Sequence, residues 1–143
     1  MIEKRTFAVG AIVLLALTTI LGGAINAQTS TSRDAMLESI RASLIQAIGG
    51  QDNAVEVSIA RNILMISCIN SSLNQSSHGV RDNEASTIAP IVSRTIAGKP
   101  EFKNIHTIRV LYVVRLKQGS HENIIDTIDF RKDPGGGFQF HTT

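Results

Sequence analysis

The sequence predicts an α+β domain in which two helices pack on one face of a mainly antiparallel sheet of four or five strands. Three observations support this prediction. Apolar residues recur at three- and four-residue steps in two segments, which is typical of amphipathic helices. In most other segments they alternate with polar residues, as in half-buried strands. The links between strands are short enough for hairpins, which favours antiparallel neighbours. The expected order is helix, two strands, helix, three strands.

The first helix is expected over residues 31–48. Thr31 and Asp34 have the spacing of an approximate capping box, which marks a helix start. An apolar stripe follows with helical periodicity, and its members are Leu37, Ile40, Leu44 and Ile48. Gly49 and Gly50 end the helix, because glycine tolerates the left-handed conformation after a last turn.

Two strands are expected next. Residues 55–59 alternate between apolar and polar side chains, which predicts a half-buried strand. Residues 63–69 are apolar almost throughout, which predicts a central or doubly covered strand. A tight turn at residues 60–62 joins the two runs, so we expect a hairpin.

The second helix is expected over residues 82–97, with Asp82 as a negative charge at its N-terminus. Its apolar face consists of Ala85, Ile88, Ile91, Val92, Thr95 and Ile96. Gly98 and Pro100 form a strong stop signal. Pro90 has two interpretations: it kinks the helix, or the regular helix starts near Ser86 and Pro90 lies in the first turn.

Three strands are expected at residues 108–116, 124–131 and 138–142, with turns at 118–120 and 133–137. A three-residue loop at 118–120 predicts four cross-strand pairs: Leu116 with Glu122, Val114 with Ile124, Tyr112 with Asp126, and Arg109 with Asp129. The opposite charges of the last pair favour this register.

An alternative fold is a cone-shaped sheet wrapped round helices. The terminal hairpin, with its turn at residues 133–137, resembles that of cystatin-like or NTF2-like domains at the level of pattern.

The N-terminal segment has the layout of a secretory signal. Lys4 and Arg5 precede an apolar run, and the segment ends in small residues up to Ala27. Cleavage there leaves residues 28–143 as a single periplasmic or secreted α+β domain. The alternative is an uncleaved membrane anchor over residues 7–25, which is long enough to cross a bilayer. The glycines at 22–23 and the threonines at 18–19 weaken that helix and favour cleavage.

Composition argues against several classes of protein. Without residues 1–27 the chain has 12 basic and 11 acidic residues, so its net charge is +1. That balance argues against a nucleic-acid binder, and the few aromatic residues argue against a base- or sugar-stacking groove. The single cysteine, Cys68, lies in an apolar run and is expected to be buried.

One pair of residues stands out as a candidate acid–base site. Alternation places Asp126 on the core face, where a carboxylate must be paired or protonated, and the register sets Tyr112 opposite it. The alternatives are a hydrogen bond at the sheet margin or a bulge that turns Asp126 to solvent.

Other candidates carry weaker signals. The four histidines are too far apart in sequence for local ligand pairs, so no metal and no cofactor are expected; they are His78, His106, His121 and His141. The segment 78–82 contains His, Arg and Asp, but we do not expect these neighbours to converge. Asn70 and Asn74 are formal glycosylation acceptors that matter only in a eukaryotic host.

The function expected from the sequence is that of an exported binding or interaction domain for a protein or small-molecule ligand. A flat, partly apolar outer sheet face would favour this reading. The first alternative is a small hydrolase- or lyase-like enzyme with an Asp126/Tyr112 pocket. The second is a membrane-tethered accessory subunit anchored by residues 7–25. Contact with a membrane is expected only if that segment is uncleaved, and dimer formation is left open.

We expect the mature protein to begin at Gln28, because Ala27 closes the small-residue end of the signal. Intact mass spectrometry of the exported protein measures this directly. A mass that includes residues 1–27 would contradict cleavage and support the anchor.

Overall fold

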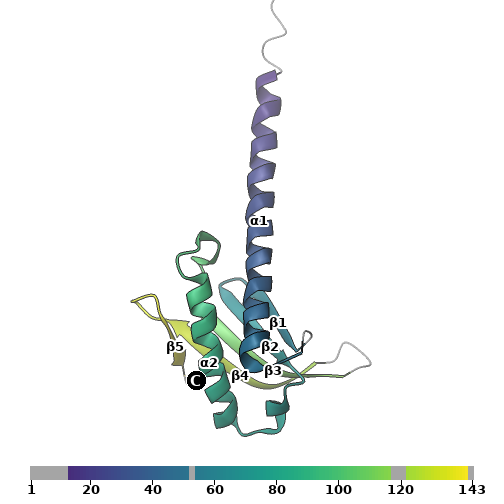
Figure 1. Ribbon diagram of the computed structural model, residues 1–143. Coiled ribbons are helices and arrows are strands. Elements are labelled where there is room, and N and C mark those ends of the chain that lie inside the picture. The colour runs from purple at the N-terminus through teal and green to yellow at the C-terminus, as the bar shows by residue number, and fades with distance from the viewer. Residues whose placement is uncertain (1–12, 52–53, 117–121, 142–143) are drawn as a thin grey trace, which may run out of the picture. The chain divides into compact units, whose positions relative to one another are not determined.

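The computed structural model describes residues 13–51, 54–116 and 122–141, and the chain divides into two compact units, Met1–Ala35 and Met36–Thr143. The first unit contains the N-terminal part of helix α1 (Val13–Ile48). The second contains the rest of α1, helix α2 (His78–Ile96) and a sheet (Figure 1). It also has two 3-10 turns, η1 (Ser72–Gln75) and η2 (Pro100–Phe102).

One five-stranded sheet forms the second layer, and its strands are β1 (Val55–Ala60), β2 (Ile63–Ile69), β3 (Thr107–Arg115), β4 (Glu122–Lys132) and β5 (Phe138–His141). Each strand pairs with the next along the chain. Three pairs are antiparallel, and β2 and β3 are parallel. The parallel pair arises because α2 carries the chain back to the edge where β2 began. The predicted α+β class and element order are confirmed, with a mixed sheet rather than a purely antiparallel one.

A single apolar core joins the layers of the second unit. Both helices contribute to it from one face of the sheet (Figure 1). Ile40 and Leu44 of α1 are completely buried, as are Ile88 and Val92 of α2. The predicted apolar stripes of both helices therefore face the sheet, with Ala89 in place of the half-buried Ile91.

Helix α1 begins at Val13, so the predicted start near Thr31 is wrong. A capping-box pattern marks a start only where the preceding residues break the helix, and residues 24–30 contain neither glycine nor proline. The helix also runs through Gly22 and Gly23. It ends as predicted, because Gly49 adopts a φ of 68°.

Part of the predicted signal, residues 1–12, lies outside the described residues. No helix in the described ranges has both the length and the apolar character of a membrane span. Cleavage after Ala27 stays a prediction.

Helix α2 begins at His78, four residues before the predicted Asp82, and passes through Pro90. A start near Ser86 is therefore wrong. Pro90 is exposed, so water can reach the carbonyl that its missing N–H would have paired. Gly98, with a φ of 70°, follows the helix end as predicted.

The register of β3 and β4 is confirmed in its central part and wrong toward the turn. Arg109 pairs with Asp129 and Tyr112 with Asp126, as predicted. A bulge between Tyr112 and Val113 then shifts the pairing by one residue. The observed partners beyond it are Val113 with Ile124, Val114 with Asn123, and Arg115 with Glu122.

The bulge changes the face on which Ile124 lies. An extra residue in one strand reverses the alternation beyond it. Ile124, predicted to face the core, is therefore 57% exposed on the opposite face. The predicted loop at 118–120 lies outside the described residues.

We expect Ile40→Ala or Leu44→Ala to lower the free energy of unfolding by about 2–5 kcal/mol, because each side chain is fully buried. Urea denaturation of the protein measures this. Gln46→Ala, at an exposed position of the same helix, is the control and should change stability by at most about 0.5 kcal/mol. Equal effects at all three positions would mean that this part of α1 does not dock on the sheet.

Candidate functional site

Asp126 lies on the helix-facing side of β4, as the register predicts, and its side chain is 12% exposed. Its carboxylate accepts a hydrogen bond from Arg81 Nε at 2.7 Å and lies 2.7 Å from His78 Nδ1. The backbone N–H of Thr127 donates to the other oxygen at 2.9 Å. The charge of Asp126 is therefore compensated mainly from α2.

Arg81 links three parts of the fold. Besides its ion pair with Asp126, its guanidinium donates to the carbonyl oxygens of Leu73, at 3.3 Å, and of Ser76. These carbonyls belong to η1 and the turn that follows it. The guanidinium is 10% exposed, so its hydrogen bonds replace those that water would otherwise make.

Tyr112 also turns to α2, and it is completely buried. Its hydroxyl lies 2.9 Å from Glu84 Oε1 and 3.1 Å from the backbone oxygen of Arg81, and both are acceptors. The predicted pair therefore shares a face. The side-chain partners of Tyr112 and Asp126, however, belong to α2, and the two residues are not partners of each other.

The pKa directions suit a structural arrangement. Burial alone would raise the pKa of Asp126, but hydrogen bonds from His78, Arg81 and Thr127 outweigh it and hold that pKa below the ordinary value. Burial, and then the nearby Glu84 carboxylate, raise the pKa of Tyr112. An ionised, fully engaged carboxylate and a neutral phenol are poorly placed for proton transfer near neutral pH.

Sequence reasoning missed how the segment 78–82 is arranged. His78, Arg81 and Asp82 converge, which corrects the expectation that they would not. Because the helix starts at His78, these residues occupy positions i, i+3 and i+4 of one face. His78 Nε2 lies 3.3 Å from Asp82, and Nδ1 contacts Asp126. The useful signal was Ser77, which lies at the N-cap five residues ahead of the predicted start.

The remaining sequence candidates are structural or lie apart. Cys68 is buried as expected, and burial raises its pKa to about 12. The Asn70 and Asn74 amides donate to the β3 carbonyls of Arg115 and Val113. His121 lies outside the described residues. Within the described ranges, no three His, Cys, Asp or Glu side chains are grouped so as to hold a metal ion.

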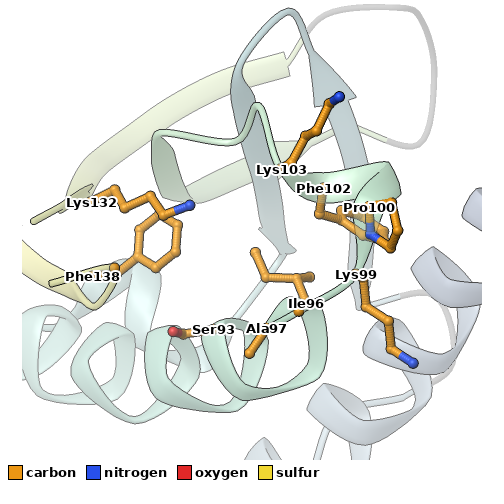
Figure 2. A pocket seen from close by; sticks show the side chains of 11 residues that line it. Ser93, Ile96, Ala97, Lys99, Pro100, Phe102, Lys103, Lys132 and Phe138 are labelled. Carbon is orange, nitrogen blue, oxygen red and sulfur yellow. The ribbon is translucent and has the colours of Figure 1, made fainter. Parts of the chain in front are cut away.

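Two cavities are lined by residues in the described ranges, and neither of these two is lined by Asp126 or Tyr112. The first, of about 450 Å³, lies between the end of α2, η2 and the β4–β5 hairpin (Figure 2). The second, of about 830 Å³, lies beside Ile48, Cys68 and Glu84. Its lining includes Gln51, Ala54 and Leu116, which lie at the ends of the described ranges. The first cavity is therefore the better defined candidate site.

The outer face of the sheet, opposite the helices, is partly apolar. It carries the half-buried Met65 and Leu111 and the exposed Ile124. Ion pairs flank these residues. Arg109 binds Asp129 through two hydrogen bonds of 2.7 Å. Arg115 bridges two glutamates, Glu56 of β1 and Glu122 of β4.

Comparison with family models, curated proteins and solved structures finds no match for this chain.

We expect the free energy of unfolding to fall as the pH rises above about 6.5, because His78 of the unfolded chain then loses its proton before His78 of the folded protein does. Hydrogen bonding and attraction to Asp126, and then attraction to Asp82, raise the pKa of His78 in the folded state. The stabilisation is therefore complete below the unfolded pKa and is lost as the pH passes the folded one.

Urea denaturation at about pH 5.5, 7 and 8.5 measures this dependence. His78→Gln should flatten it, since glutamine does not titrate. His106→Gln is the control, because this exposed histidine makes neither contact. Parallel pH dependences for the wild type and His78→Gln would contradict the expectation.

Proposed function

We propose that the protein is an exported binding domain that takes a small ligand in the cavity between α2, η2 and the β4–β5 hairpin. The observation that carries this proposal is the cavity itself. Its volume of about 450 Å³ lies within the range of small-molecule sites. Its floor includes the buried Ile96 and Phe102 and the half-buried Phe138 (Figure 2). Export rests on the signal pattern of residues 1–27.

The polar cluster around Asp126 supports binding over catalysis. A general base needs an accessible carboxylate or imidazole within reach of a substrate proton. The oxygens of Asp126 already accept from Arg81 and Thr127, and both nitrogens of His78 face carboxylates. Neither cavity is lined by this cluster. The hydrolase- or lyase-like alternative thus has the predicted strand register, but neither of these two cavities is lined by Asp126 or Tyr112.

We expect 1-octanol, a neutral amphiphile, to bind in this cavity. In a titration of the labelled protein followed by nuclear magnetic resonance, the shifted amides should lie in residues 93–103 and 132–138. Ala97→Trp should abolish these shifts, because Ala97 lines the cavity and an indole would fill it. Ser86→Trp, at an exposed position of the same helix, should leave them unchanged. Shifts that are absent, or that survive Ala97→Trp, would overturn the proposal.

A second candidate function is self-association through the outer face of the sheet. The exposed Ile124 favours it, since apolar residues framed by polar ones mark protein contacts. The charged residues of this face are balanced, and they are Arg109, Arg115, Arg131, Glu56, Glu122 and Asp129. A face without net charge does not repel a second copy of itself, so the partner we propose is another copy of this chain.

We expect sedimentation analysis to show a concentration-dependent dimer that Ile124→Lys disrupts, because the ammonium group would be buried in the interface. Val80→Lys is the control, since Val80 is also exposed but lies on α2. A monomer at all concentrations, or a dimer that Ile124→Lys leaves intact, would contradict this candidate.

A further inference from the structure

We infer that the ligand of the cavity described above is an amphipathic carboxylate, with its apolar part on the Ile96–Phe102–Phe138 floor and its charged head beside Lys132. This inference rests on the proposed function and adds the chemical class of the ligand.

The cavity combines an apolar floor with a cationic rim. Lys99, Lys103 and Lys132 line it, and no aspartate or glutamate does. Lys99 and Lys103 flank η2, and Lys132 is the last residue of β4, so the fold brings the third lysine to the other two from a distant part of the chain. Such a lining favours an anion that also carries apolar surface.

Internal carboxylates do not neutralise these lysines. In the described part of the chain the ion pairs are made by arginines and His78, and none involves the three lysines. Asp133 follows Lys132 in sequence, but its oxygens accept from the Gly137 N–H and the Gln139 side chain. The cationic groups are therefore available to a ligand.

The lysines differ in direction. Figure 2 shows Lys132 alongside Phe138, with its nitrogen directed toward the opposite wall. That placement follows from the pairing of Lys132 with Phe138 across β4 and β5. The nitrogens of Lys99 and Lys103 are directed outward in the same view. Lys132 is thus placed to contact the ligand head, and the other two add long-range attraction.

The end of α2 limits how much negative charge the ligand can carry, and this favours one charge over several. A helix C-terminus presents carbonyl oxygens, which repel anions. The Ile96 carbonyl is already capped by the Lys99 N–H at 3.1 Å, which reduces this repulsion. The lining residues of α2 come from its C-terminal end, whereas a helix that binds phosphate presents its N-terminal end.

The inference is tested by comparing octanoate with 1-octanol, which matches its chain but lacks the charge. In the magnetic-resonance titration of the full chain, we expect octanoate to bind at least about tenfold more tightly than octanol, as one charge-assisted hydrogen bond would produce. Acetate, which has the charge without the chain, should not shift residues 93–103 and 132–138 at matched concentrations.

Two variants locate the effect. Lys132→Gln should weaken octanoate about tenfold and leave octanol unchanged. Arg131→Gln is the matched control: it removes the same charge from the neighbouring residue, which is exposed on the outer face of the same strand. It should change neither affinity. Both variants are at exposed positions, so folding is expected to be preserved, and their urea denaturation verifies this.

Each outcome decides between the two proposals. Equal affinity for octanoate and octanol in the wild type would overturn the ligand class and leave the small-ligand cavity standing. The same holds if Lys132→Gln and Arg131→Gln weaken octanoate equally, because the preference would then reflect net charge alone. Absence of cavity shifts with both compounds would overturn both proposals.

Discussion

The ion pair between Arg81 and Asp126 is the contact on which the position of α2 depends. Both side chains are about nine-tenths buried, so each ion has lost most of its hydration and depends on the other. Arg81 also holds the carbonyls of Leu73 and Ser76, which fixes the η1 segment that leads into the helix. Because α2 is the crossover between β2 and β3, this pair ties the N-terminal end of that crossover to β4, beside the apolar contacts of Ile88 and Val92.

The position of α2 in turn determines what surrounds each of its two ends. At its N-terminal end the helix supplies Glu84 and a backbone carbonyl to the Tyr112 hydroxyl, so a large polar side chain can be buried. At its other end, Ser93 and Ile96 line the cavity. The N-terminal end of the helix therefore has a structural role, through its polar contacts. The C-terminal end has the proposed binding role, through its apolar contacts.

Much of the fold follows from local patterns in the sequence. The strands were predictable because side chains alternate with a period of two, and the Arg109–Asp129 pair sets the register. The bulge beside Tyr112 was not predictable, because a single extra residue leaves no local signal and depends on how the strands fit together. The start of α2 was missed because Gly79 obscures the helical pattern after Ser77. Without that start, the contact between His78 and Asp126 could not be predicted either.

The cavity illustrates why a binding site is harder to predict than a strand. Lys99 and Lys132 are far apart in the chain, and each taken alone reads as an ordinary surface lysine. They line one hollow only because the end of α2 packs beside the β4–β5 hairpin. Arg81, Arg109 and Arg115 form ion pairs that join one element to another, whereas none of the ion pairs of the described residues involves the lysines of this rim. Charged groups that form no ion pair within the fold remain available for a ligand. For this reason we place the proposed binding site at the cavity and not at the Asp126 cluster, whose charged groups are already paired.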